Sequence, residues 1–179
     1  MKRTTQLTRP PAPFCATLAL IRADAILREP PARSHIVRPD LSGVCVARFV
    51  LPLDLVKPQN RTRFQKHWAM AKLETEVAAA MRVQCAPRPE PLPGRPRVLC
   101  CRFSSTEPDR FNDGFKIAID MLTAPKPALT RKGTVRRYVP KLRLNLIRDD
   151  SNRCAQVEQW WEPAPPRQGF GLIEVYEAT

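Results

Sequence analysis

The sequence predicts an α+β fold with a small mixed β-sheet and two main helices. Two helix-like segments are separated by a strand-like segment that is rich in apolar and β-branched residues. Two further strand-like segments follow the second helix near the C-terminus, so strands and helices do not alternate strictly. With 179 residues and a hydrophobic fraction of 43%, the chain is long enough to form one domain with a core.

Residues 1–43 are predicted to be a flexible extension rich in proline and arginine, followed by one folded domain over residues 44–179. No period of 3.6 or 2 persists in this extension. Its start superficially resembles a signal peptide, but the apolar run Phe14–Ile21 is short and is closed by Arg22. We therefore do not expect secretion.

The first predicted strand is Val44–Leu53, a run of apolar and β-branched residues that follows Gly43. A polar loop comes next. The first main helix is predicted over Thr62–Val83, which is rich in Ala, Lys and Glu and contains neither Gly nor Pro. Its core-facing side chains are predicted from helical spacing to be Phe64, Trp68, Ala71, Ala78 and Met81.

A central strand is predicted over Arg97–Ser105, after the proline-rich loop Ala86–Pro96. Cys100 and Cys101 lie in its apolar run, and we interpret them as small buried residues rather than as part of a disulfide framework. No CxxC pair occurs in the sequence, and neither histidine has a cysteine at ligand spacing. A zinc site is therefore not expected.

The acidic segment Glu107–Leu122, EPDRFNDGFKIAIDML, is predicted to be the second main helix. At ~100° per residue its side chains separate into a charged stripe and an apolar face. Because like charges four residues apart repel one another, such a stripe is typical of a cation site or a reaction. The stripe contains Asp109, Asp113, Lys116 and Asp120, and the apolar face contains Phe115, Ala118, Ile119 and Leu122.

Three features complete the predicted domain. Thr123–Arg143 is predicted to be an inserted basic loop, since it contains many Lys and Arg residues and no acid. The apolar run LNLIRDD then ends in the acidic pair Asp149 and Asp150. The segments Ala155–Pro163 and Gly169–Glu177 are separated by the turn-forming sequence APPRQG, and they are predicted to pair as a β-hairpin.

The formal net charge of +13 predicts a polyanionic partner. Nucleic acid is the first interpretation, an anionic membrane surface the second, and a merely soluble or ribosome-like basic protein the alternative. No stretch approaches the ~18 apolar residues of a membrane span. We expect nucleic acid rather than a membrane as the partner. The candidate DNA contacts are Lys57, Asn60, Arg61, Arg63, Arg131, Lys132, Arg136 and Arg137, and the alternative is that they lie in solvated loops without a role.

The acids of the two segments are predicted to form one metal site for Mg²⁺, with Mn²⁺ as an alternative. Clustered carboxylates suit this ion, because it prefers oxygen ligands, and two such ions can cleave a phosphodiester together. Lys116 is a candidate to orient a phosphate or to hold a carboxylate. The sequence has no GxSxG, Walker loop or GxGxxG, so neither a serine nucleophile nor a nucleotide cofactor is expected. The candidate metal ligands are Asp109, Asp113, Asp149 and Asp150.

Five stretches resemble the RusA family of Holliday-junction resolvases, which are small dimeric endonucleases common in phages and prophages. They are FVLPLDLVKPQNRTR, RFNDGFKIAIDML, LNLIRDD and the pair QVEQWW and FGLIEVYE. The resemblance covers about three quarters of the chain. In the register set by Lys116 and Asp120, Asn112 and Asp113 stand where the family has Asp-Asn. The family also has an aspartate before this Asp-Asn pair, and Arg110 stands at its position here. The segment between the helix and the Asp-Asp pair is longer than is usual in the family.

The resemblance implies an Mg²⁺-dependent homodimeric nuclease that resolves branched DNA by paired nicks in the cytoplasm of a bacterial or phage-infected cell. Asp113, Asp150 and Lys116 would inherit the catalytic roles. The acids that bind metal would be Asp149, Asp150 and either Asp113 or Asp109. Two alternatives stay open, namely a protein of the same fold that binds DNA with weakened or lost cleavage, and a basic RNA- or DNA-binding module whose acidic stripe is a solvated helix face.

Overall fold

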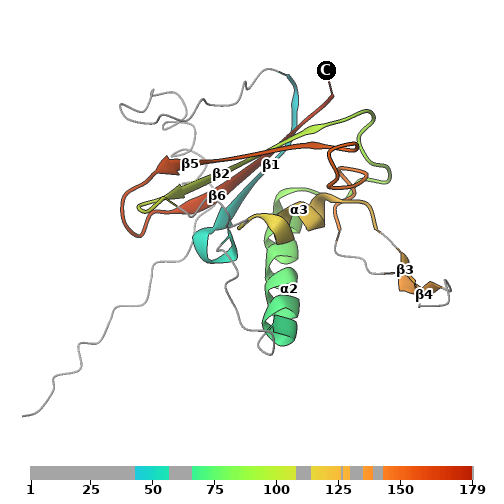
Figure 1. The fold of residues 1–179 in the computed structure, drawn as a ribbon, viewed down its shortest axis with the longest axis horizontal. Coiled ribbons are helices and arrows are strands. Elements are labelled where there is room, and N and C mark those ends of the chain that lie inside the picture. The colour runs from blue at the N-terminus through green and yellow to red at the C-terminus, as the bar shows by residue number, and fades with distance from the viewer. Residues whose placement is uncertain are drawn as a thin grey trace, which may run out of the picture.

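The protein has a mixed α+β fold, as predicted, with one four-stranded sheet and two helices packed on it (Figure 1). The computed structural model describes residues 43–56, 66–107, 114–125, 127–129, 135–138 and 143–178. The elements in chain order are β1 Cys45–Pro52, the 3-10 helix η1 Leu53–Val56, α2 Lys66–Gln84, β2 Arg97–Ser104, α3 Lys116–Leu122, β3 Pro127–Leu129, β4 Val135–Tyr138, β5 Gln156–Pro163 and β6 Phe170–Tyr176.

The four-stranded sheet has the order β1-β6-β2-β5. Strand β6 pairs antiparallel with both β1 and β2, whereas β5 pairs parallel with β2 at one edge. The predicted strands over residues 44–53, 97–105, 155–163 and 169–177 are therefore present, and β2 is central as expected. The predicted hairpin between the last two strands is wrong, because β2 lies between β5 and β6.

The connection between β5 and β6 explains this arrangement. Neighbouring strands lie about 4.8 Å apart, so the chain must span about twice that distance to cross the end of β2. Residues 164–169 make the crossing, and the backbone N–H of Ala164 donates to the carbonyl of Ser104 at 3.1 Å. A Cβ at Gly169 would lie 2.7 Å from the carbonyl oxygen of Phe103, so a side chain here would collide with backbone. The sequence APPRQG thus forms a crossing rather than a tight turn.

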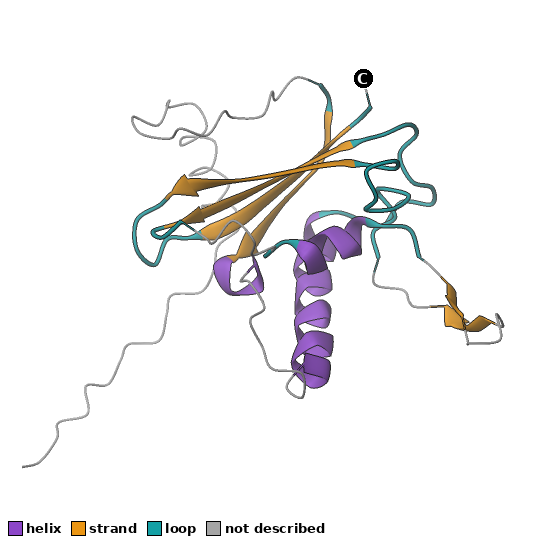
Figure 2. Cartoon of the chain, in the orientation of Figure 1, coloured by secondary structure: helices purple, strands orange, loops and turns teal. Residues whose placement is uncertain are grey.

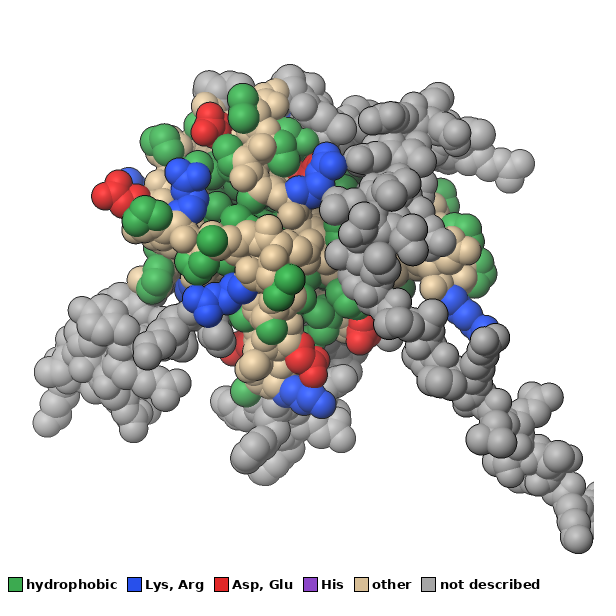
Figure 3. All heavy atoms as spheres, turned by 180° about the vertical axis from the view of Figure 1, so that it is seen from behind, with side chains coloured by type: hydrophobic (Ala, Val, Ile, Leu, Met, Phe, Trp, Pro, Cys, Tyr) green, Lys and Arg blue, Asp and Glu red, His purple; other side chains and the backbone are tan. Residues whose placement is uncertain are grey.

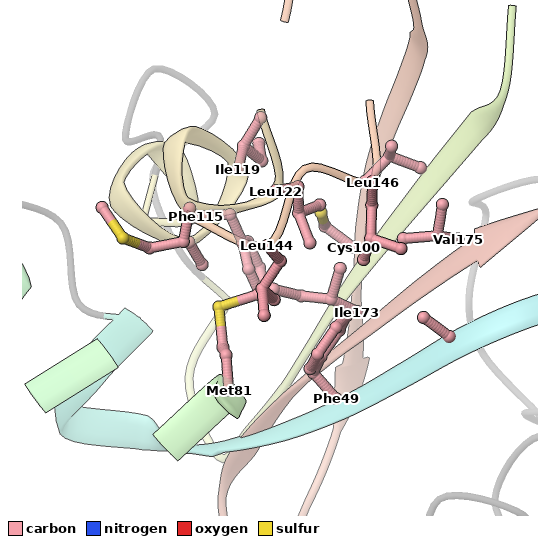
Figure 4. Packing of buried hydrophobic residues seen from close by; sticks show 14 of the residues in the cluster. Phe49, Met81, Cys100, Phe115, Ile119, Leu122, Leu144, Leu146, Ile173 and Val175 are labelled. Carbon is pink, nitrogen blue, oxygen red and sulfur yellow. The ribbon is translucent and has the colours of Figure 1, made fainter. Parts of the chain in front are cut away.

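Both helices cover the same face of the four-stranded sheet (Figure 2). Side chains from α2, α3, the segment 144–147 and the strands meet in one buried apolar cluster between these layers, as Figure 4 shows for Met81, Phe115 and Leu144. Cys100 of β2 is fully buried in this cluster, whereas Cys101 is buried on the opposite face of the sheet. Both are fully buried and neither forms a disulfide within the described residues, which agrees with their interpretation as small apolar residues.

Among the described side chains of α2, those that pack tightly on the sheet lie in its C-terminal half. Val77, Ala78 and Met81 are buried, whereas Ala71 is exposed. The prediction that Ala71 faces the core is therefore wrong, because the N-terminal part of α2 extends beyond the sheet (Figure 1). Of the other predicted core residues, Phe64 lies outside the described residues, and nothing is described of the side chain of Trp68. The side-chain amide of Gln84 closes the helix onto β1, since it donates to the Val50 carbonyl at 2.9 Å and accepts from the Val50 N–H at 2.8 Å.

The opposite face of the sheet carries a second apolar cluster and two buried acids, Glu162 and Glu174. Glu174 of β6 is 1% exposed, and its Oε1 lies 2.6 Å from Nη2 of Arg48 on β1. The pair is close without the alignment of a hydrogen bond, while the hydroxyl of Tyr176 donates to Oε2 of Glu174 at 3.0 Å. Burial, assisted by the Glu174 charge, raises the pKa of Tyr176 well above its ordinary range.

Strands β3 and β4 form a separate two-stranded antiparallel sheet that lies away from the main sheet (Figure 1). Both strands fall within the segment 123–143, which was predicted to be a basic loop, so part of that insertion has regular structure. Across the described residues, no helix is both long enough and apolar enough to cross a membrane.

Candidate active site beside helix α3

Helix α3 is shorter than the sequence predicts. The α-helix begins at Lys116 and ends at Leu122, while Glu107 has no regular structure and residues 108–113 lie outside the described residues. Its predicted apolar face is confirmed, because Phe115, Ala118, Ile119 and Leu122 are all buried.

A close approach of α3 to strand β6 fixes the start of the helix. A Cβ added at Gly171 would lie 3.1 Å from Cε1 of Phe115 and 2.8 Å from Cγ1 of Val56. Only a residue without a side chain therefore lets Phe115 and η1 pack directly on β6. Phe115 immediately precedes Lys116, so this contact also determines the position of Lys116 relative to the sheet.

Backbone hydrogen bonds fix the segment 144–147, which follows the basic insertion, on two sides. The N–H of Leu144 donates to the Met121 carbonyl at 2.7 Å, and the N–H of Leu146 donates to the Leu122 carbonyl at 2.8 Å. On the other side, the N–H groups of Arg88 and Leu92 donate to the carbonyls of Leu144 and Leu146, both at 2.9 Å. The segment is thus fixed between the end of α3 and the loop over residues 86–96.

Asp149 and Asp150 follow this anchored segment directly. Ile147 is fully buried before them, and Ala155 is fully buried after them at the start of β5. The turn between is closed by the N–H of Cys154, which donates to the Ser151 carbonyl at 2.8 Å. Both acids are therefore carried on a short stretch whose two ends are attached to the core.

Lys116 joins the two predicted acidic segments. Its Nζ donates to Oδ1 of Asp120 at 2.8 Å, one turn further along α3. The same ammonium donates to Oδ2 of Asp150, which is 34 residues away in sequence. All three side chains are partly exposed, so the group is open to solvent on one side. Lys116 therefore links the start of α3 to the turn that carries Asp150.

The pKa of Lys116 reflects two opposing influences. Partial burial disfavours the charged ammonium and lowers its pKa. Hydrogen bonds to Asp120 and Asp150, together with the attraction of their charges, act in the other direction and outweigh burial, so the net pKa is raised above 10.5. Lys116 therefore remains a cation at neutral pH and neutralises part of the acidic cluster.

The second predicted carboxylate, Asp149, lies beside this pair in sequence. Its Oδ1 accepts a hydrogen bond from the N–H of Ser151 at 3.2 Å, which orients the side chain within the turn. Carboxylate oxygens are the donors that Mg²⁺ prefers, so Asp149 and Asp150 have suitable chemistry. However, no group of three or more His, Cys, Asp or Glu side chains is suitably placed to hold a metal among the residues that the structure describes. A metal site of the predicted composition therefore needs a further ligand from outside them.

Most of the other predicted site residues lie outside the described residues. These are the two remaining acids, Asp109 and Asp113, and the candidate DNA contacts Lys57, Asn60, Arg61, Arg63, Arg131 and Lys132. Arg136 and Arg137 lie on strand β4, and nothing is described of their side chains.

The described side chains carry little of the positive charge excess. Acidic and basic residues are nearly balanced among them, so most of the net charge of +13 belongs to the rest of the chain. Figure 3 shows one face of the molecule, on which described Lys and Arg side chains are scattered among Asp, Glu and apolar side chains. The described body therefore lacks a basic patch on this face.

Sequence reasoning placed Asp120 on the acidic stripe but did not include it among the site residues. Its spacing of four from Lys116 was the signal that could have identified it as an ion-pair partner.

Comparisons of this chain with protein-family models, with curated proteins and with solved structures find no match. The resemblance to the RusA resolvases therefore rests on the motif residues themselves.

Proposed function

We propose that the chain is an Mg²⁺-dependent endonuclease of the RusA type, which resolves four-way DNA junctions by paired nicks in recombination and repair. The observation that carries this proposal is the contact between Lys116 and Asp150. It joins the two segments that carry the family-like motifs, although nothing in their spacing along the chain requires them to meet. A lysine beside an Asp-Asp pair suits a reaction in which negative charge develops on a phosphate.

The proposed metal ligands are Asp149, Asp150 and either Asp113 or Asp109. When bound, Mg²⁺ would lower the pKa of an attacking water and stabilise the leaving oxygen. Lys116 holds the Asp150 carboxylate by one oxygen, and the Ser151 N–H orients Asp149. These contacts hold the Asp150 carboxylate beside α3 and orient the Asp149 carboxylate within the turn. Without its ammonium partner, Asp150 would be free to rotate away.

The proposed substrate and assembly follow from charge and symmetry. A net charge of +13 favours a polyanion, and the candidate contacts in residues 57–63 and 131–137 belong to the basic segments. A four-way junction has two strands to be cut, and a homodimer with two-fold symmetry would present one active site to each of them. We therefore propose DNA and a second copy of the chain as the partners.

A second candidate is a DNA-binding protein of the same fold that cleaves weakly or not at all. The observation that favours it is that Lys116 binds both Asp120 and Asp150, so part of the acidic charge is already neutralised without a metal. The sequence also favours this candidate, because Asn112 and Arg110 stand at positions where the family has acids.

The test is incubation of the purified full chain with a synthetic four-way junction, labelled on each strand in turn, in Mg²⁺ or Mn²⁺. The proposal expects nicks at symmetric positions on two opposing strands and none in excess EDTA. Asp150→Asn should abolish nicking while junction binding in EDTA persists, because the acid acts on the metal rather than on the DNA backbone.

Each alternative predicts a different result. Junction binding without symmetric nicks, unchanged by Asp150→Asn, would establish the DNA-binding candidate. A basic RNA- or DNA-binding module would keep every activity after Asp113→Asn and Asp150→Asn, and its affinity for Mg²⁺ would not depend on these residues.

A further inference from the structure

Arg102 lies on the helix-bearing face of the sheet, one strand in from the edge strand β5. Along β2 the alternate residues Val98 and Cys100 belong to the apolar cluster beneath the helices, so Arg102 continues that face. Its neighbours across the sheet are Trp161 on β5 and Gly171 on β6.

The guanidinium of Arg102 is partly shielded, and two of its three nitrogens lack hydrogen-bond partners among the described residues. Its Nε and Nη1 atoms are buried and have no hydrogen-bond partner, and within the described part of the chain no carboxylate forms an ion pair with it. Burial lowers the pKa of Arg102, yet an arginine stays charged at any physiological pH. Partial burial of an unpaired charge still costs free energy, because the two buried nitrogens have lost water and gained no other partner.

Other arginines on the same sheet show the contrast. Arg97, also on β2 but on the opposite face, lies 3.4 Å from Glu158, and Arg48 on β1 lies 2.6 Å from Glu174. Each is matched by an acid on an adjacent strand. Since the sheet supplies acids to these two arginines, the missing partner of Arg102 indicates an anion that is not part of the described chain.

The indole of Trp161 forms a fixed wall beside Arg102. Its Nε1–H donates to both the carbonyl and the hydroxyl oxygen of Ser104, at 3.1 and 3.0 Å, so the orientation of the ring is set. The ring is only half-buried, and Gln159, two residues earlier on the same face of β5, is exposed. The helices therefore leave this part of the sheet open over its edge strand.

Gly171 relates this region to the candidate active site. Arg102 is its neighbour across the sheet, and Phe115 packs directly over it. Strand neighbours lie about 5 Å apart, so Arg102 and Phe115 flank the same glycine. Lys116 follows Phe115, which places Arg102 close to the start of α3.

We propose that Arg102 and the adjacent indole of Trp161 form a subsite that binds a backbone phosphate of the nucleic acid and stacks on the neighbouring sugar or base. The planar guanidinium matches phosphate geometry, and a half-buried indole offers an apolar surface of fixed orientation. This inference rests on the proposed nucleic-acid-binding function and adds to it a contact on the rigid sheet, separate from the basic segments.

The test compares Arg102→Met with Arg82→Met, which removes an exposed arginine from the last turn of α2. Binding of a labelled four-way junction is measured in EDTA over a range of salt concentrations, so that no cleavage occurs. Arg102→Met should weaken binding on the order of tenfold. The slope of log affinity against log salt should fall by about 0.9, the value for one phosphate contact. Arg82→Met should leave both quantities unchanged.

Thermal unfolding separates a binding role from a structural one. Methionine keeps much of the apolar stem and removes a shielded charge, so Arg102→Met should melt at the same temperature as the wild type or higher. Arg102→Lys should retain the salt slope but bind less tightly than the wild type, because an ammonium keeps the charge without the planar fork.

Three outcomes would overturn the subsite. In the first, Arg102→Met binds the junction with the affinity and salt slope of the wild type, while the wild type binds and cleaves. That result would leave the proposed nuclease function intact. Another is a lowered melting temperature with an unchanged slope, which would make Arg102 structural. Failure of the wild type to bind any junction would overturn both proposals. Binding without cleavage, with the slope reduced in Arg102→Met, would support the subsite and remove only the nuclease.

Discussion

The ammonium of Lys116 donates to the carboxylate of Asp150 across 34 residues of sequence. The positions of both residues depend on packing contacts made by neighbouring parts of the chain. Phe115, packed over Gly171, fixes the start of the helix that carries Lys116, and the segment bound to the end of that helix carries Asp150. The contact between Lys116 and Asp150 therefore depends on how α3 and the segment after it pack on the sheet.

The first prediction compares Asp150→Asn with Asp120→Asn. Both changes weaken a hydrogen bond to the same ammonium, so their effects on the lysine are matched. Under the nuclease proposal only Asp150 also binds metal. We expect Asp150→Asn to lower the rate of junction nicking at least a hundredfold and Asp120→Asn to lower it less than tenfold, measured in single-turnover assays.

Equal reductions of the nicking rate in these two variants would assign the effect to Lys116 rather than to a metal ligand. Junction binding in EDTA serves as the control, because neither substitution should weaken it.

The second prediction concerns stability at high pH. The pKa of Lys116 is raised in the folded protein, so its contribution is fully present below the ordinary value of 10.5 and is lost as pH rises through the higher folded value. Wild type should therefore lose more stability than Lys116→Met does as pH rises from roughly 10 to 12, as measured by urea unfolding. The difference should be less than about 1 kcal/mol, because the pair is partly exposed and screened by solvent.

Burial also raises the pKa values of Tyr176 and Cys45. At high pH these two groups ionise more readily in the unfolded chain, so the wild type and Lys116→Met are both destabilised as pH rises. That common effect cancels in the comparison. Identical curves for the two proteins would mean that the ion pairs of Lys116 do not contribute to stability.

The third prediction tests the close approach at Gly171. Gly171→Ala should destabilise the fold by about 1–3 kcal/mol, because the new methyl overlaps Val56 and Phe115. In a Val56→Ala background the same substitution should cost less, since two of the overlapping methyl groups have been removed. Urea unfolding of the four proteins of this cycle gives the coupling energy, and strictly additive effects would contradict the close approach.

The fourth prediction addresses the basic insertion. If its side chains bind DNA phosphates, Arg136→Gln with Arg137→Gln should weaken junction binding and reduce the salt slope by ~0.9 for each phosphate that is no longer neutralised. Fluorescence anisotropy at several salt concentrations measures both quantities. A slope equal to that of the wild type would remove strand β4 from the interface.

Strand positions could be predicted from sequence because they depend on local composition. The apolar run around Cys100 marked β2 as central, and Gly43 and Pro52 bounded β1. Pairing could not be predicted in the same way. APPRQG contains turn-forming residues whether the chain folds back on its neighbour or crosses another strand, so only the position of β2 decides between the two.

The candidate site was predicted in part. Spacing placed Lys116 and Asp120 on one stripe, and the family resemblance supplied Asp150 as a partner. The length of α3 was overestimated, because helical periodicity in the acidic segment gives no information about where tertiary packing lets the helix begin. The missing counter-ion of Arg102 depends on the acids of neighbouring strands, which no local pattern encodes.

The central position of β6 has a consequence for how the chain folds. This strand is the last of the described elements, yet it lies between β1 and β2 and joins them. Until residues 170–176 have been synthesised, β1 has no partner in the four-stranded sheet, and its backbone N–H and C=O groups stay exposed. Folding must therefore wait for pairings between distant segments, which are slow to form and leave the growing chain prone to aggregation in the interval.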